Sequence, residues 1–171
     1  DYYIRVSAPV AWATPSVLTL KAGAAGSILL DASINGGASG TLKLDAGTGG
    51  ISQLGTAPVT APYLRVTSAG GVAMNANNNI GTLAGSVTGP GFSFTNINDL
   101  AVGTVGVSGL TVGTGDVALT VSGPNKKLTI TDPVTATSGN VSYTADHQSH
   151  SAATTSGGGS NWIEVKPDTP G

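Results

Sequence analysis

Hydrophobic and polar residues alternate in short runs along most of the chain. Between Thr41 and Gln53, Leu42 and Leu44 alternate with polar residues before a Gly-rich turn leads into another short run. Alternation with a period of two is typical of a β-strand that buries one face. No stretch shows the i, i+3, i+4 spacing of an amphipathic helix. The pattern therefore predicts an all-β protein.

The run recurs nine times, and the spacing of its copies predicts how the strands are arranged. One series has steps of about 24, 22, 28, 25 and 24 residues, a period typical of repeat architectures. Its members are Leu18, Leu42, Leu64, Phe92, Val117 and Val141. A second series begins 8 to 11 residues after members of the first, at Ile28, Val72 and Leu128. Each repeat thus holds two or three short strands, which predicts a β-solenoid of about six coils over residues 17–146 rather than a sandwich.

The segments outside this regular pattern receive separate predictions. Residues 1–16 are predicted to be an N-terminal edge strand or cap, because prolines bracket part of them and proline is confined to strand edges. The longest step of the series predicts a loop that protrudes near residues 85–91. Residues 147–160 are predicted to be a flexible polar linker. Residues 161–171 are predicted to be a C-terminal strand and tail that pairs with the solenoid flank or with an adjacent molecule.

The composition agrees with a stack of coils. Charged residues make up 9% of the 171 residues, whereas ordinary domains contain about 25%. Because equivalent positions of successive coils lie side by side, repeated charges would repel one another, and a solenoid tolerates few of them. The Thr, Ser, Gly and Val content is typical of extracellular β-structures rather than of cytosolic enzymes.

Charge and hydropathy exclude some partners. The net charge is −2 and the largest basic cluster is Lys126-Lys127, so nucleic acid is not an expected partner. No run of 18 apolar residues occurs, so no membrane span is expected. The chain has no cysteine, which a large ladder core does not need. The first residues read as a mature strand, so any export signal is expected to have been removed or to lie outside this sequence.

Four stretches resemble the repeat shaft of filamentous-haemagglutinin-type large exoproteins. They are Asp45–Gln53, Asn79–Gly85, Asp99–Val105 and Gly139–Asp146, within a likeness that covers about residues 17–146. The resemblance implies a single-stranded right-handed parallel β-helix in a secreted bacterial adhesin of the two-partner-secretion class. The chain departs from that family because residues 1–16 show no recognisable secretion domain, no Arg-Gly-Asp occurs, and residues 147–171 do not match the repeats.

Metal-binding and acidic residues were weighed as sites. His147 and His150 could hold a metal, but Asp146 is the one further ligand nearby, so a polar linker explains them better and no metal or cofactor is expected. Four aspartates end strands, and we expect each to bond a nearby backbone N–H at a corner rather than to act in catalysis. They are Asp31, Asp45, Asp132 and Asp146.

Threonine and aromatic residues suggest surface roles. The Thr-x-Thr pairs at 129 and 131 and at 135 and 137 could belong to an ice-binding face, but they occur only locally, so we expect solvated strand faces. Aromatic residues outside the solenoid, together with two apolar residues of the C-terminal strand, are candidate partner contacts. The candidate contacts are Tyr2, Tyr3, Trp12, Trp162, Ile163 and Val165.

These observations predict a non-enzymatic, structural or adhesive segment of a secreted bacterial cell-surface fibre. Its partners would be neighbouring copies or adjoining segments of the same fibre, which meet at the solenoid ends, and glycans of a host or surface. One alternative is a filament subunit that stacks end to end through residues 1–7 or 161–166. The other is a carbohydrate-binding β-helix, which would show a groove lined by aromatic residues, or a polysaccharide-degrading β-helix, which would need carboxylates and basic residues clustered on one face. The seven basic residues look scattered in the sequence, which disfavours an enzyme.

Overall fold

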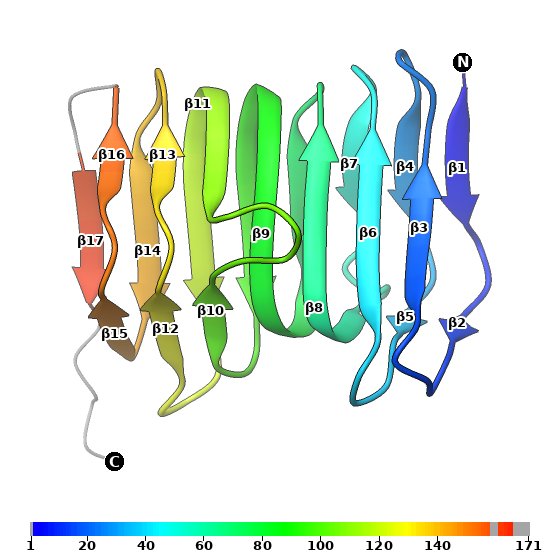
Figure 1. Ribbon diagram of the computed structural model, residues 1–171, viewed down its shortest axis with the longest axis horizontal. Coiled ribbons are helices and arrows are strands. Elements are labelled where there is room, and N and C mark those ends of the chain that lie inside the picture. The colour runs from blue at the N-terminus through cyan, green and yellow to red at the C-terminus, as the bar shows by residue number, and fades with distance from the viewer. Residues whose placement is uncertain (1, 158–160, 166–171) are drawn as a thin grey trace.

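The chain folds into a right-handed parallel β-helix of about six turns, which confirms the predicted fold class (Figure 1). The computed structural model describes residues 2–157 and 161–165, with side chains up to residue 157. Within those residues there is no helix, and every ladder between strands is parallel. Each coil therefore satisfies the backbone groups of the next, as stacking requires.

The described residues contain 17 strands in one continuous sheet. In chain order they are β1 (Tyr3–Val6), β2 (Val10–Ala11), β3 (Val17–Lys21), β4 (Ser27–Leu30), β5 (Ile34–Asn35), β6 (Thr41–Ala46), β7 (Gly50–Gln53), β8 (Val59–Ser68), β9 (Val72–Asn96), β10 (Leu100–Val102), β11 (Leu110–Val121), β12 (Lys127–Ile130), β13 (Val134–Ala136), β14 (Val141–Ala145), β15 (His147–His150), β16 (Thr154–Ser156) and β17 (Asn161–Val165).

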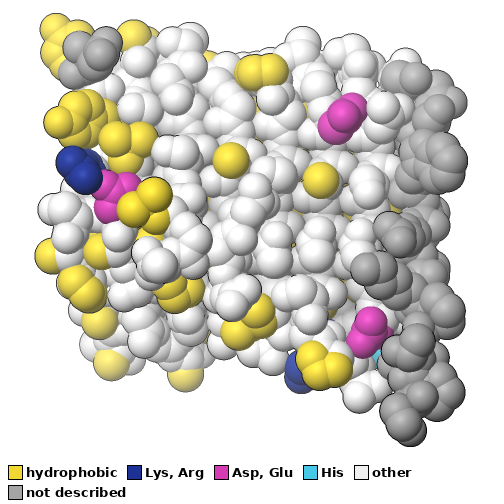
Figure 2. All heavy atoms as spheres, turned by 180° about the vertical axis from the view of Figure 1, so that it is seen from behind, with side chains coloured by type: hydrophobic (Ala, Val, Ile, Leu, Met, Phe, Trp, Pro, Cys, Tyr) yellow, Lys and Arg dark blue, Asp and Glu magenta, His cyan; other side chains and the backbone are white. Residues whose placement is uncertain are grey.

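The strands form three sides of the solenoid. The first side contains β1, β4, β7, parts of β9 and β11, β14 and β17. The second side is narrow and starts with β2 and β5. The third side contains β3, β6, the end of β8, the middle of β9, β10 with the start of β11, β12 with β13, and β15 with β16, and it lies in front in Figure 1. The first side, seen from behind in Figure 2, shows few charged side chains.

Inward-facing residues stack on residues of the same kind and form the core. On the third side Leu42 pairs with Leu64 and Leu64 with Leu83, and all three are fully buried. On the first side Phe92 pairs with Val117 and Val117 with Val141. The predicted single series was therefore wrong at its longest step, because it joined two different sides. The coil that contains residues 64–83 is short, so Leu64 meets Leu83 and not Phe92.

The predicted protruding loop also lies elsewhere. Residues 85–91 fall inside β9, whereas residues 103–109, between β10 and β11, leave the stack and cross in front of β9 (Figure 1). This segment, which we call the lip, is closed by the N–H of Gly109, which donates to the carbonyl of Gly103 (3.0 Å). The glycines near 85–91 gave the wrong signal because small residues let adjacent coils approach closely as well as form loops.

Both ends of the described chain are built from strands that pair with the neighbouring coil. Residues 1–16 contain β1 and β2, which pair with β4 and β5, so the first coil begins near Tyr3. Residues 147–160 were expected to be a flexible linker, but β15 pairs with β12 and β16 with β13. Pairing with the preceding coil, and not a hydrophobic pattern of its own, places residues 147–150 and 154–156 in strands, so the sequence carries little sign of them.

Buried amide side chains support one corner of the stack. The Oδ1 of Asn78 accepts hydrogen bonds from Nε2 of Gln53 (2.7 Å) and from the backbone N–H of Val59 (2.9 Å). Its Nδ2 donates to the carbonyls of Met74 (3.1 Å) and Thr95 (3.0 Å). Asn78 is fully buried and therefore replaces water for backbone groups that the turn leaves unpaired.

Candidate functional site

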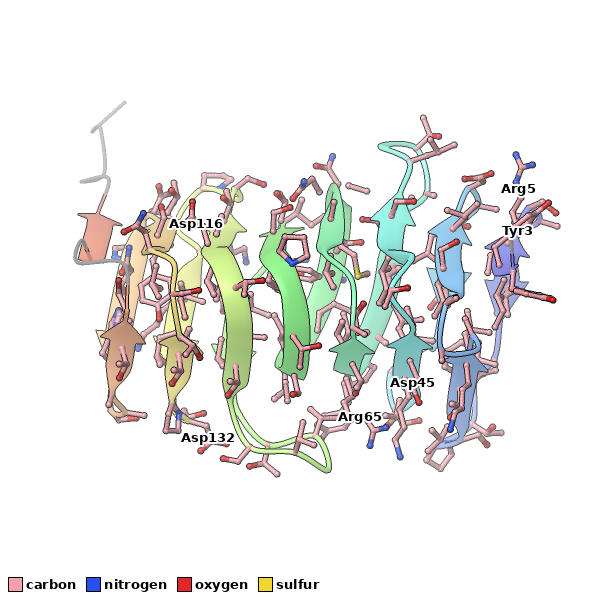
Figure 3. The ribbon with its side chains drawn as sticks, turned by 90° about the horizontal axis from the view of Figure 1, so that it is seen from above. Tyr3, Arg5, Asp45, Arg65, Asp116 and Asp132 are labelled. Atoms are coloured by element: carbon pink, nitrogen blue, oxygen red, sulfur yellow. The ribbon has the colours of Figure 1, made fainter. Side chains whose placement is uncertain are left out.

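A group of charged residues gathers on the third side of the solenoid. Lys21, Lys43, Asp45 and Arg65 lie on β3, β6 and β8, and we call this group the cationic face. Three of the seven basic residues of the chain lie here beside one aspartate. Figure 3 shows Asp45 and Arg65 on the same side of the ribbon as the lip. The sequence had suggested that basic residues are scattered, and the fold brings these three together.

Strand alternation and register create the cationic face. Leu42 and Leu44 point into the core, so Lys43 and Asp45 point outward. The same alternation in β8 turns Arg65 outward. The ladder between β6 and β8 then pairs Lys43 directly with Arg65, and the ladder between β3 and β6 pairs Lys21 with Asp45.

The charges on this face are only partly compensated. Nζ of Lys21 lies 3.8 Å from Oδ2 of Asp45, a surface ion pair that contributes little to stability. Among the residues that the structure describes, neither Lys43 nor Arg65 forms an ion pair. Nε of Arg65 is buried and has no hydrogen-bond partner in the described part of the chain. Two cations thus lie side by side on adjacent strands, an arrangement that costs free energy.

The lip forms a wall beside Arg65. Val105 is almost fully buried, and Ala84, which faces outward next to Arg65, is fully buried as well. Gly106 lies close to the guanidinium, because a Cβ built on Gly106 would be 3.8 Å from Nη1 of Arg65. The lip therefore shields the inner part of the guanidinium from solvent.

Neutral side chains border the cationic pair. Tyr63 is 45% exposed and lies two positions before Arg65, on the same face of β8. The ladders place Thr41 and Thr82 on either side of Tyr63. On the other side, Thr67 and Ser86 line a groove of about 500 Å³ together with Lys21 and Asp45. An aromatic ring, hydroxyl groups and cations therefore share one surface.

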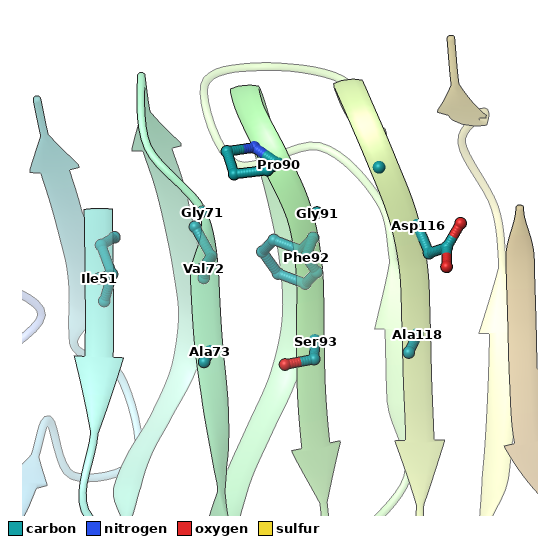
Figure 4. Close-up of a pocket in the computed structure, with 11 residues that line it drawn as sticks. Ile51, Gly71, Val72, Ala73, Pro90, Gly91, Phe92, Ser93, Asp116 and Ala118 are labelled. Atoms are coloured by element: carbon teal, nitrogen blue, oxygen red, sulfur yellow. The ribbon is translucent and has the colours of Figure 1, made fainter. Parts of the chain in front are cut away.

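A second groove offers less chemistry. It has a volume of about 520 Å³ and lies on the first side over parts of β7, β9 and β11 (Figure 4). Its walls are small or apolar apart from Ser93 and Asp116. The carboxylate of Asp116 accepts a hydrogen bond from the backbone N–H of Asn140 (2.8 Å), so it is engaged in holding the next coil.

The candidate partner contacts from the sequence fall at the two ends of the described stack. Tyr2 and Tyr3 are exposed at the first coil. Trp12 is half-buried, lies against Gly36 and Gly40, and donates from Nε1 to the carbonyl of Ser16 (3.2 Å). The contacts expected at Trp162, Ile163 and Val165 lie in β17, whose side chains are outside the described residues.

The two histidines lie on β15 and not in a linker. The ring of His150 lies 5.2 Å from that of Tyr143, and its Nε2 is hydrogen-bonded to the side chain of Gln148 (3.1 Å). Burial raises the pKa of Tyr143 to about 12, an effect that the hydrogen bond with Thr154 partly opposes. Within the described residues no three His, Cys, Asp or Glu side chains are grouped as metal ligands.

The aspartates that were expected to cap corners behave differently from one another. Asp146 accepts a hydrogen bond from the backbone N–H of Asn125 (2.8 Å), which belongs to the preceding coil. The other three have side-chain partners instead. Asp31 pairs with Arg5, Asp45 with Lys21, and Asp132 accepts a hydrogen bond from the hydroxyl of Thr104.

The register also builds a hydroxyl column that the sequence did not reveal. Thr67 pairs with Ser86, and the column continues through Thr111 and Thr135 to Thr155. These residues are separated by unequal steps in the sequence, so only the three-dimensional register shows that they lie side by side. Both this column and the cationic pair could have been predicted from the sequence if the number of residues in each coil of the third side had been assigned correctly.

Comparisons with protein-family models, with curated proteins and with solved structures find no match to the chain. In the part of the chain that the structure describes, no helix is long and apolar enough to cross a membrane.

Proposed function

We propose that the chain is a structural or adhesive, non-enzymatic segment of a secreted bacterial surface fibre. The single observation that carries this proposal is the open end of the first coil. Within the described residues β1, β2 and β3 each pair with one strand only, so their outer edges present unpaired backbone groups. An open parallel edge accepts another strand.

The side chains at this end are also left uncovered. Ile4, Leu18 and Leu20 point toward the core but are only partly buried. Four of the six large hydrophobic residues that are exposed in the described chain belong to this coil. They are Tyr2 (81%), Tyr3 (57%), Val10 (37%) and Val17 (53%). Figure 2 shows hydrophobic side chains gathered toward the same end of the first side.

A further coil would cover both the edges and the side chains. It would come either from an adjoining segment of a longer fibre or from another copy of the chain. A head-to-tail contact between copies does not close on itself and therefore produces a filament. Few charges along the body suit such a stack, because like charges in register repel.

The test is association through the open end. We expect the purified chain to form end-to-end particles as its concentration rises, seen by light scattering after size exclusion and by negative-stain microscopy. Lysines introduced on the edge by Tyr3→Lys and Val17→Lys should abolish association, because charged edge residues prevent strand addition. Leu54→Lys is the matched control, since Leu54 is 53% exposed but lies after β7, away from the open end.

Two results would count against the proposal. One is a chain that stays monomeric at all accessible concentrations, with the same hydrogen-exchange protection in β1–β3 as in the central strands. The other is association that Leu54→Lys reduces as strongly as the edge variants do.

The alternative of a carbohydrate-binding or polysaccharide-degrading β-helix is favoured by the cationic face, where Lys21, Lys43, Asp45 and Arg65 meet. Binding and cleavage can be separated by incubating the chain with an oligosaccharide of uronic acids and following product release. Cleavage would overturn the non-enzymatic proposal.

A further inference from the structure

Among the side chains that the structure describes, no acid compensates the pair of Lys43 and Arg65. The two residues are direct partners in the β6–β8 ladder, where backbones are roughly 4.8 Å apart. Asp45, the nearest acid along the strand, is engaged with Lys21 (3.8 Å). Only 9% of the residues in the chain are charged, so two cations that pair in register are unusual for this protein.

The lip determines from which direction Arg65 can be neutralised. Its Nε is buried without a partner among the residues that are described, and the segment around Val105 and Gly106 covers the inner side of the guanidinium. Arg65 and Lys43 are both only half-buried, so an anion can approach both from outside. A carboxylate suits this position, because its two oxygens can accept from a guanidinium and an ammonium together.

The surroundings favour a sugar as the carrier of that carboxylate. The exposed ring of Tyr63 lies next to the pair, and an aromatic face packs against the apolar face of a sugar ring. Thr41, Thr82 and Thr67 add hydroxyl groups around it. Nucleic acid would require several more cations along the same face.

We propose that Lys43, Arg65 and Tyr63 form a binding site for an acidic glycan that carries carboxylate groups, such as a polyuronate. Lys43 and Arg65 bind the carboxylate, Tyr63 packs against the ring, and the lip holds the guanidinium in place. This proposal rests on the adhesive role proposed above and gives it a class of ligand. It requires no fibre to form, so it can be tested on the single chain.

The experiment titrates the whole chain with tri-galacturonic acid, followed by calorimetry or NMR chemical shifts. The methyl-esterified trisaccharide is the neutral control and inorganic sulfate is the simple-ion control. We expect the acid to bind at least tenfold more tightly than its ester. Lys43→Gln and Arg65→Gln should each weaken binding about tenfold or more, the loss of one charge-assisted contact. Lys126→Gln, which removes a charge elsewhere, should leave binding unchanged.

Tyr63→Ser separates a sugar site from an ion site. It should weaken binding of the trisaccharide and leave any binding of sulfate unchanged. Circular dichroism checks that each variant is folded, and Lys43→Gln carries the test if Arg65→Gln does not fold. Equal affinity for acid and ester, equal loss in Lys126→Gln, or no binding at all would overturn the site. Association through the open end without glycan binding would refute the site alone, and binding without association would refute only the assembly of copies.

Discussion

At the scale of single residues, stability depends on a few buried polar groups whose partners are all in the backbone or in other amides. Asn78 is the clearest case, because its side chain bonds groups from three different coils. Asn78→Ala would leave the N–H of Val59 and the carbonyls of Met74 and Thr95 without this partner. Since each buried unsatisfied group costs about 1–3 kcal/mol, we expect the free energy of unfolding to fall by about 3 kcal/mol or more.

Asn77→Ala is the matched control for that measurement. Asn77 is the preceding residue of the same strand but faces solvent, so its replacement should change the denaturation midpoint little. Urea denaturation of both variants measures and compares their free energies of unfolding. Similar losses in the two would show that the buried amide is not what supports this corner.

At the scale of elements, the lip shows how a local irregularity shapes a surface. Gly106 and Gly109 both have positive φ (72° and 71°). A Cβ at Gly109 would lie 2.1 Å from the carbonyl oxygen of Pro133, whereas at Gly106 it would meet only the end of the Arg65 side chain. We expect Gly106→Ala to cost about 1 kcal/mol from backbone strain, and Gly109→Ala at least about twice as much. Thermal denaturation ranks the two variants by their loss of stability. A larger loss of stability in Gly106→Ala than in Gly109→Ala would contradict this prediction.

Elements also show how far the sequence could predict this structure. The alternation at Leu42 and Leu64 predicted strands, coils and a solenoid, because inward residues must be apolar wherever coils stack. The cationic pair and the lip were missed for a different reason. Outward residues carry no pattern of their own, and whether Lys43 meets Arg65 depends on the length of one turn, which varies from coil to coil. The glycines at 103, 106 and 109 resemble those of tight corners, so their number alone does not mark a protruding loop.

At the scale of the whole molecule, a solenoid is a sum of coils and of the contacts between neighbours. A coil with a neighbour on each side therefore contributes more to the free energy of unfolding than a coil with a single neighbour. Leu20 and Leu44 make a direct comparison, because they are register partners in adjacent coils. Leu44 is fully buried, whereas Leu20 in the first coil is only partly covered. The two side chains are chemically identical, so a difference between them reports their position in the stack.

We expect Leu44→Ala to lower the free energy of unfolding by about 3 kcal/mol and Leu20→Ala by about half of that, since a cavity forms only where neighbours enclose the side chain. Hydrogen exchange should show the same gradient, with the amides of β1–β3 exchanging faster than those of β8 and β9. Under conditions in which the open end associates, the added neighbour would bury Leu20, and the cost of Leu20→Ala should rise toward that of Leu44→Ala. Equal costs in the monomer would mean that the first coil is already covered, which would remove the physical reason for adding another coil at this end.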